Sequence, residues 1–118
     1  MPLKSFDWIQ QFSGGVTVSD SSGIILSMND KASQIFAKNG GKNLIGKSLL
    51  DCHPGASLQK LRELLKHPRI NAYTIEKDGV KKLIYQAPWF NEGVFAGLVE
   101  LSLEIPFEME NFVRIPQS

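Results

Sequence analysis

The chain has 118 residues, and its 13 Lys and Arg side chains against 12 Asp and Glu leave a formal net charge of +1. That length suits one domain with one core, and the balanced charge argues against a nucleic-acid partner because no basic field would attract phosphates. No apolar run approaches the roughly 20 residues that cross a bilayer, and the N-terminus lacks an apolar signal segment. The single cysteine, Cys52, excludes an internal disulfide and a multi-cysteine zinc site. We therefore expect a cytoplasmic protein with no membrane or nucleic-acid partner and no metal site.

The N-terminal segment, residues 1–13, is predicted to form a short helix that flanks the domain. Phe6, Ile9 and Phe12 recur at near-helical spacing with Trp8 beside them, and Gly14-Gly15 ends the pattern. So short a helix is marginal in water by itself. We therefore expect its apolar side to pack against the domain or against a second protomer.

Two strands and a helix are expected next. Residues 16–19 and 24–28 are apolar, β-rich runs on either side of the turn formers Asp20-Ser21-Ser22-Gly23. Asn29 is predicted to cap a helix that extends to about Lys38. The apolar stripe of this helix consists of Ala32, Ile35 and Phe36.

The middle of the chain is predicted to contain short or irregular elements and one longer helix. A helical turn is expected over residues 48–51, and Pro54-Gly55 make the following piece irregular. Ser57 is expected to cap a helix over residues 58–66, which Pro68 ends. Its buried stripe is predicted to be Leu58, Leu61, Leu64 and Leu65.

Three strands are expected in the last third of the chain. Asp78-Gly79 is a strong two-residue hairpin signal between residues 72–77 and the strand that ends at Trp89, and Asn91-Glu92-Gly93 predicts a three-residue loop with a bulge. Side chains alternate faces along a strand, so the uniformly apolar odd positions of residues 94–105 are predicted to face the core. These positions are Phe95, Gly97, Val99, Leu101, Leu103 and Ile105. The even positions Val94, Ala96 and Leu98 are also apolar and require a cover.

Residues 106–118 are predicted to form a short amphipathic helical tail, because Met109, Phe112 and Val113 are at helical spacing. The whole order is helix, two strands, short helices, then three strands. This order predicts an α+β fold with a five-stranded antiparallel sheet and the helices inserted between strands two and three.

The ordered features of residues 14–105 resemble a PAS domain, a family of small sensor and interaction modules. Residues 15–20 and 23–29 resemble its opening hairpin and the asparagine that starts its first core helix, for which residues 32–36 are a match. Leu44-Ile45-Gly46-Lys47 resembles the step after that helix, and residues 88–100 resemble the final hairpin. The resemblance implies a glove-shaped sheet whose concave face is closed by short helices, with any cofactor or metabolite between them.

The resemblance also implies which residues line the cavity. The candidate ligand-binding residues are Leu49, Cys52, His53, Tyr73, Tyr85, Phe95 and Val99, and the wider wall adds Val18, Ile35, Leu61 and Leu101. Tyr73 and Tyr85 could hydrogen-bond a polar ligand, although strand tyrosines are more often packing residues.

Cys52 and His53 are the most reactive pair in the sequence. A thiol beside an imidazole can be a nucleophile, but adjacent side chains usually point apart, and the nearest carboxylate to orient them is Asp51, which is also adjacent. We therefore predict no catalytic function. Some PAS relatives hold haem iron through one cavity histidine, and His53 is better placed for this than His67, but the wider haem motifs are missing. A flavin adduct is disfavoured because the reactive cysteine position holds Leu49.

The predicted function is that of a bacterial-type PAS sensor domain in signal transduction or transcriptional regulation, which binds a small molecule, a protein partner or both. The alternative is a ligand-free interaction or dimerisation module with a filled core, and an enzyme that uses Cys52 and His53 is the third class. No output motif is visible, so we expect a fragment of a longer chain or a module that acts by association. A homodimer is expected, with an interface made by Phe6, Trp8, Ile9, Phe12, Val94 and Leu98.

Overall fold

A computed structural model describes residues 7–52 and 55–116. The strands are β1 (Gly15–Ser19), β2 (Ile25–Met28), β3 (Asn71–Lys77), β4 (Val80–Asn91) and β5 (Val94–Ile105). The helices are α1 (Asp30–Ile35) and α2 (Gly55–Lys66), and the 3-10 turns are η1 (Ala37–Asn39), η2 (Gly41–Leu44) and η3 (Leu49–Cys52). The strands pair antiparallel in the order β2-β1-β5-β4-β3, with all these helical elements inserted between β2 and β3. The predicted α+β fold is confirmed.

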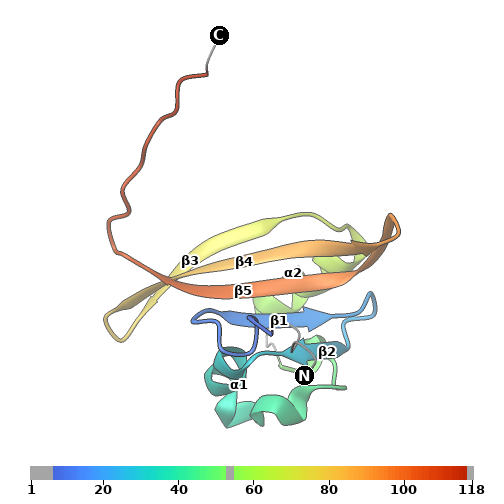
Figure 1. Ribbon diagram of the computed structural model, residues 1–118. Helices are drawn as coiled ribbons and strands as arrows, with labels where there is room; N and C mark the ends of the chain where they lie inside the picture. The colour runs from blue at the N-terminus through green and yellow to red at the C-terminus, as the bar shows by residue number, and fades with distance from the viewer. Residues whose placement is uncertain (1–6, 53–54, 117–118) are drawn as a thin grey trace, which may run out of the picture.

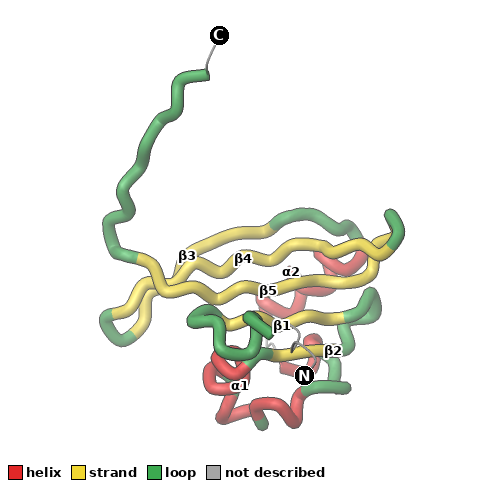
Figure 2. The backbone as a smooth tube through the Cα atoms, in the orientation of Figure 1, coloured by secondary structure: helices red, strands yellow, loops and turns green. Residues whose placement is uncertain are grey.

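The helical elements lie on one side of the sheet (Figures 1 and 2). We call the side of the sheet toward α1 and α2 the inner face and the opposite side the outer face. β4 and β5 form a long hairpin whose strands have 12 residues each. None of the described helices is long and apolar enough to cross a membrane.

Both tight hairpins use residues with a positive φ angle. Asp78 and Gly79 have φ angles of 53° and 77°, and Glu92 and Gly93 have φ angles of 51° and 79°. Two successive positive φ angles are typical of the two-residue turn that matches strand twist. The loop between β4 and β5 is therefore Glu92-Gly93, one residue shorter than predicted. The bulge is nearby, where the register shifts between Trp89 and Phe90.

The core lies between the helical elements and the inner face. Leu61 and Leu64 of α2 pack with residues of the opening hairpin, α1, η2 and η3, and Leu98 of β5 closes the cluster from the sheet. Burial of such side chains, worth about 1.5–3 kcal/mol each, is what holds the helical layer on the sheet. The buried cluster consists of Ile25, Met28, Ala32, Leu44, Leu49, Leu61, Leu64 and Leu98.

The predicted core face of β5 is wrong for most of the strand. Leu98 is 3% exposed within the core cluster, and Glu100 and Ser102 border the space under α1. Alternation therefore places Val99 and Leu101 on the outer face. Phe95 does pack against the core, because the bulge changes the phase of alternation before Leu98. Both faces of β5 are apolar in part, so alternation alone could not decide between them.

Asn29 connects β1, α1 and the N-terminal segment. Its side chain is 1% exposed, and its Oδ1 accepts hydrogen bonds from the backbone N–H groups of Val16 (2.9 Å) and Ala32 (3.0 Å). Its Nδ2 donates to the carbonyl oxygens of Ile9 and Gly14, both at 2.8 Å. The predicted N-cap is therefore confirmed, and the amide uses both its donors and both its acceptor sites.

The predicted N-terminal helix is wrong over the described residues 7–13. Residues 8–11 form a turn, and Trp8 contacts Phe12 edge-to-face at 5.8 Å between ring centroids. The carbonyl of Gln10 accepts a hydrogen bond from the Asp30 N–H (3.1 Å), as that of Ile9 does from Asn29. Residues at the start of α1 thus donate hydrogen bonds to carbonyl groups that an N-terminal helix would have used for its own backbone hydrogen bonds. Phe6 lies outside the described residues.

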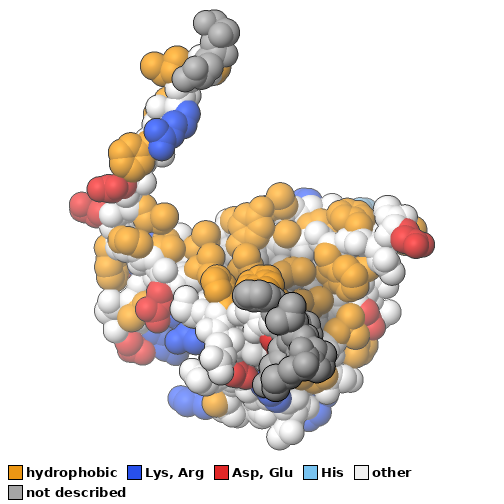
Figure 3. All heavy atoms as spheres, viewed as in Figure 1, with side chains coloured by type: hydrophobic (Ala, Val, Ile, Leu, Met, Phe, Trp, Pro, Cys, Tyr) orange, Lys and Arg blue, Asp and Glu red, His pale blue; other side chains and the backbone are white. Residues whose placement is uncertain are grey.

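The predicted C-terminal helix is also wrong. Residues 106–116 contain no helix and extend away from the end of β5 (Figure 1). Val113 is 83% exposed, and the hydrophobic side chains of the tail are visible along it (Figure 3). A short amphipathic helix needs an apolar surface to pack on, and the described residues of this chain offer the tail none.

Candidate functional site

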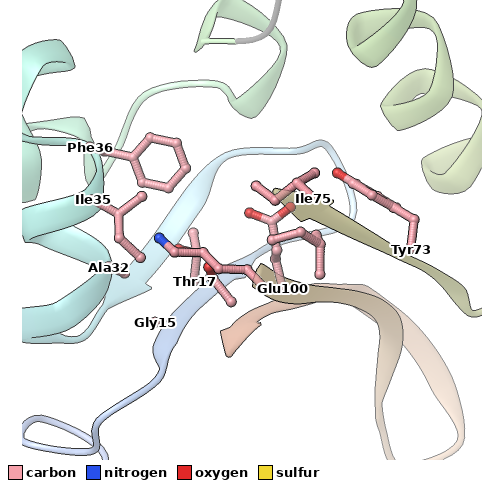
Figure 4. Close-up of a pocket in the computed structure, with 11 residues that line it drawn as sticks. Gly15, Thr17, Ala32, Ile35, Phe36, Tyr73, Ile75 and Glu100 are labelled. Atoms are coloured by element: carbon pink, nitrogen blue, oxygen red, sulfur yellow. The ribbon is translucent and has the colours of Figure 1, made fainter. Parts of the chain in front are cut away.

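A cavity of about 220 Å³ lies between α1 and the inner face of the sheet (Figure 4). Ala32, Ile35 and Phe36 form the wall on the α1 side. The sheet forms the other wall with Gly15, Thr17, Tyr73, Ile75, Lys82, Ile84, Glu100 and Ser102. The side chains of Tyr73 and Ile75 on β3 are 44% and 41% exposed, so the cavity opens to solvent along this strand.

A row of polar side chains crosses the inner face beside this cavity. Thr17, Glu100, Gln86 and Asn71 are successive partners in the register of β1, β5, β4 and β3. Gln86 Nε2 donates a hydrogen bond to Glu100 Oε1 at 2.8 Å, and Asn71 Nδ2 donates to Gln86 Oε1 at 2.8 Å. Because each amide donates toward β5, the Glu100 carboxylate is the acceptor at the end of the chain.

Glu100 and Thr17 mark the boundary between the cavity and the core. Both line the main cavity and also two spaces of about 10 Å³ each, which are otherwise walled mostly by core residues such as Leu49. A space of that size holds at most about one water molecule. The carboxylate therefore has apolar packing on one side and the larger cavity on the other.

Tyr73 brings a hydroxyl group to the cavity from β3. In Figure 4 its ring points toward the space that Ile75 and Glu100 also border. Burial, and then the negative charge of Glu100, raise the pKa of the Tyr73 hydroxyl. The hydroxyl keeps its proton at neutral pH and can both donate and accept a hydrogen bond.

The cavity also holds a positive charge. Lys82 of β4 lines it together with Glu100. Ion pairs shorter than 4.0 Å in residues 7–52 and 55–116 join Lys42 to Asp30 and Arg69 to Glu63, and neither involves Lys82 or Glu100. Two opposite charges therefore line one small cavity without pairing with each other.

The structure brings together only some of the predicted ligand-binding residues. Tyr73 lines the cavity, Leu49 lies in the core beside it, and Phe95 packs against that core. Tyr85 and Val99 do not reach the cavity: Tyr85 pairs with Leu101, next to Val99, on the outer face. Of the wider wall, Ile35 lines the cavity and Leu61 lies in the core, whereas Val18 and Leu101 are on the outer face.

Two predicted residues cannot be placed. His53, the candidate haem ligand, lies outside the described residues, and Cys52 ends η3 with no described side chain. Among the side chains that are described, no cluster of three or more His, Cys, Asp or Glu residues could hold a metal ion.

The predicted interface residues do not form one surface. Leu98 is buried in the core, whereas Val94 is 68% exposed beside the β4–β5 turn. Trp8 and Phe12 are exposed on the N-terminal turn, and Ile9 is half-buried there. Leu98 cannot contact a partner because the core cluster covers it.

Sequence reasoning missed the polar residues of the site: Thr17, Lys82, Gln86, Glu100 and Ser102. A weak signal existed for Glu100, because a carboxylate between Val99 and Leu101 in an apolar strand suggests a functional position. Its hydrogen-bond partner Gln86, and Asn71 beyond it, could be identified only once the strand register was known.

Comparison with solved structures found this fold in sensory proteins. A sensory box sensor histidine kinase from Vibrio cholerae is 16% identical, with a TM-score of 0.61, and the match covers 84% of this chain and 87% of that one. The Aer2 receptor from Vibrio cholerae, a dual PAS-haem oxygen sensor, is 15% identical, with a TM-score of 0.59 and coverage of 80% and 96%. The Vibrio cholerae VqmA dimer, a LuxR-type receptor, is 13% identical, with a TM-score of 0.67 and coverage of 91% and 54%.

No protein-family model and no curated protein sequence matched the chain. The structural matches nevertheless have TM-scores of 0.59 to 0.67 over 80% or more of this chain. The chain has a PAS-like fold, as the resemblance in the sequence predicted.

Proposed function

We propose that this protein is a PAS-type signalling module that binds a small molecule in the cavity between α1 and the sheet. The observation that carries the proposal is the half-buried Glu100 carboxylate, which terminates the Asn71–Gln86 hydrogen-bond chain beside a cavity. A polar chain that only stabilised the fold would not need an open space at its end. Pockets with apolar walls and a few converging polar groups are typical ligand sites.

The size of the cavity favours a small metabolite over a macrocycle. Its volume of about 220 Å³ is below the ~300–1,000 Å³ of pockets that hold drug-sized ligands. None of the described residues that line this cavity is a histidine, so we propose no haem function although Aer2 is a haem sensor. A solved structure of VqmA is bound to DPO, which supports a ligand-binding role for this fold.

We propose recognition as the task of the site, without catalysis. The polar groups of the cavity converge on one carboxylate, and this arrangement suits the binding of a donor group on a ligand. The signal would leave through the segments that flank the domain, either to a further domain or to a partner.

Native mass spectrometry of protein purified from its own host tests the proposal, because it reports bound ligand and oligomeric state together. We expect a bound small molecule, and we expect Ser102→Phe, which fills the cavity, to remove it. Thr74→Phe, which adds the same ring on exposed β3, is the matched control and should keep the ligand. Protein that carries no ligand, and whose melting temperature no metabolite fraction raises, would overturn the proposal.

A ligand-free dimerisation module is the second candidate, and the outer face favours it. Leu83, Tyr85, Val99, Leu101 and Leu103 are half-buried there, and no described helix covers them. Hydrophobic side chains gather over the strands in the space-filling view (Figure 3). An apolar sheet face of this kind is a candidate protein interface, and the two functions are compatible in one homodimeric sensor.

A further inference from the structure

We propose that the ligand is a small zwitterion with separated charges, whose ammonium group binds Glu100 and whose anionic group binds Lys82. This inference rests on the proposed function, and it names the chemical class of the ligand. It depends on three features of the cavity: an open carboxylate oxygen, an unpaired lysine, and the distance between their strand positions.

The negative end of the cavity is the second oxygen of Glu100. Gln86 donates to Oε1, and no described group bonds Oε2. Among the described residues, no buried side-chain oxygen or nitrogen lacks a hydrogen-bond partner. Oε2 must therefore reach accessible space, where a ligand ammonium group can donate to it. Thr17 and Tyr73 add two hydroxyl groups at this end.

The positive end is the ammonium group of Lys82. Lys82 also lines a neighbouring groove, which it shares with Asp78 and with its exposed register partner Glu104. No ion pair shorter than 4.0 Å joins Lys82 to either carboxylate among the described residues. Lys82 is thus charged, half-buried and without a counter-ion at less than 4.0 Å. An anionic ligand group would supply one.

The strand register separates the two ends. Glu100 lies opposite Gln86, and Lys82 is four residues away from Gln86 on the same strand. At about 3.4 Å per residue the two rows are roughly 14 Å apart along the backbone, a gap that the long lysine side chain narrows. Between the rows the cavity wall is apolar, with Ile35, Ile75 and Ile84. The site therefore suits a ligand with a charge at each end of a short apolar chain.

The volume indicates the length of chain that the cavity itself can hold. An apolar protein cavity of about 150 Å³ binds benzene, which has six heavy atoms. The present cavity, of about 220 Å³, has room for a somewhat larger molecule. An ω-amino acid with a chain of about five carbon atoms is of this size.

Five probes with the same five-carbon skeleton test the inference by titration calorimetry and by amide shifts in NMR spectra. They are δ-aminovalerate, norvaline, pentylamine, pentanoate and pentanol. We expect δ-aminovalerate to bind at least tenfold more tightly than pentylamine or pentanoate, because each of those two probes lacks one of the two charged hydrogen-bonding groups. Shifted amides should belong to Ile35, Ile84 and Ser102. Equal or tighter binding of norvaline, or of pentanol, would overturn the inference.

Two matched pairs of variants identify the charges. Glu100→Gln keeps the side-chain shape and should weaken δ-aminovalerate about tenfold or more, whereas Glu104→Gln removes the same charge from the exposed end of β5 and should not. Lys82→Met should also weaken the binding of δ-aminovalerate about tenfold or more, whereas the control Lys77→Met should leave it unchanged. Circular dichroism melting curves confirm that each variant is folded.

The two proposals fail differently. If a host metabolite occupies the cavity but is neutral, or if Glu100→Gln does not weaken it, the zwitterion is wrong and the sensor function stands. If δ-aminovalerate and every host fraction fail to bind, both proposals are wrong.

Discussion

At the residue scale, one buried amide and one half-buried carboxylate organise this protein. Asn29 connects β1, α1 and the N-terminal turn through four hydrogen bonds. Glu100 accepts the last hydrogen bond of the polar chain on the inner face. Asn29 is fully shielded from water, and Glu100 is shielded in part. A hydrogen bond lost in such a place leaves its partner unsatisfied, which costs about 1–3 kcal/mol.

Asn29→Ala is expected to lower the free energy of unfolding by about 2–4 kcal/mol. It removes the N-cap of α1 and leaves buried backbone groups without hydrogen-bond partners. Urea denaturation followed by circular dichroism measures this difference. Asn43→Ala is the control, because the exposed Asn43 side chain makes no described hydrogen bond and should cost less than about 0.5 kcal/mol. Equal effects of the two variants would contradict the assigned role of Asn29.

Tyr73 is expected to ionise at a higher pH than an ordinary, solvent-exposed tyrosine side chain. Its pKa is raised by burial and then by Glu100, so the folded state holds the phenolic proton more tightly than the unfolded state does. The stabilisation from this proton is therefore present below a pH of about 10, the ordinary tyrosine value, and is lost as the pH rises through the higher folded pKa.

Phenolate absorbance of Tyr85→Phe, in which Tyr73 is the one remaining tyrosine, measures that pKa directly. Adding Glu100→Gln should lower it, because the substitution removes the charge that opposes ionisation. A Tyr73 pKa that Glu100→Gln leaves unchanged would show that burial alone is responsible.

At the element scale, β1 and β5 are held together by a close backbone contact at Gly97. A Cβ atom there would lie 1.9 Å from the carbonyl oxygen of Ser19, which also accepts a hydrogen bond from Trp89 Nε1 at 2.9 Å. Ser19 Oγ in turn accepts a hydrogen bond from the Leu98 N–H at 3.2 Å. Only glycine permits this approach, because it has no Cβ atom. The pairing of the opening hairpin with the final hairpin therefore depends on Gly97.

Gly97→Ala is expected to reduce stability by about 1–3 kcal/mol or more, because strand β1 must move away from β5. Gly79→Ala is the matched control: Gly79 also has a positive φ, but a Cβ atom there meets nothing within 4 Å. The difference between the two thermal unfolding curves isolates the backbone clash from conformational strain. A smaller loss for Gly97→Ala than for Gly79→Ala would contradict this account.

At the scale of the whole molecule, both faces of the sheet carry apolar side chains, and the helical layer covers one of them. The inner face forms the core and the cavity, while the half-buried aliphatic and aromatic side chains of the outer face have no helical cover in the described part of the chain. Burial of apolar surface contributes roughly 25 cal/mol per Å². A second protomer on the outer face would therefore stabilise both copies.

Leu101→Glu is expected to abolish the proposed homodimer, because it places a charge at the centre of the outer face. Ile45→Glu introduces the same change at an exposed apolar residue on the helical side and should leave the dimer intact. Sedimentation velocity over a range of concentrations measures both. If the wild-type protein is monomeric throughout that range of concentrations, the proposed homodimer is wrong.

The sequence by itself determined the element order, the antiparallel sheet and the cap at Asn29. These features follow from local signals, namely turn residues, periodicity and the preference of asparagine for the start of a helix. The same signals failed at the two ends of the chain, because the short helices expected there needed an apolar surface that tertiary structure did not provide.

Only the tertiary structure decided which face of β5 is buried and which residues form the cavity. Both faces of that strand carry apolar side chains, and a bulge near its start changes the phase of alternation, so sequence parity put Val99 inside and Glu100 outside. The polar row from Asn71 to Thr17 joins residues that are far apart in the chain and meet only through strand register. The site is thus a property of strand pairing, which depends on contacts that no local pattern contains.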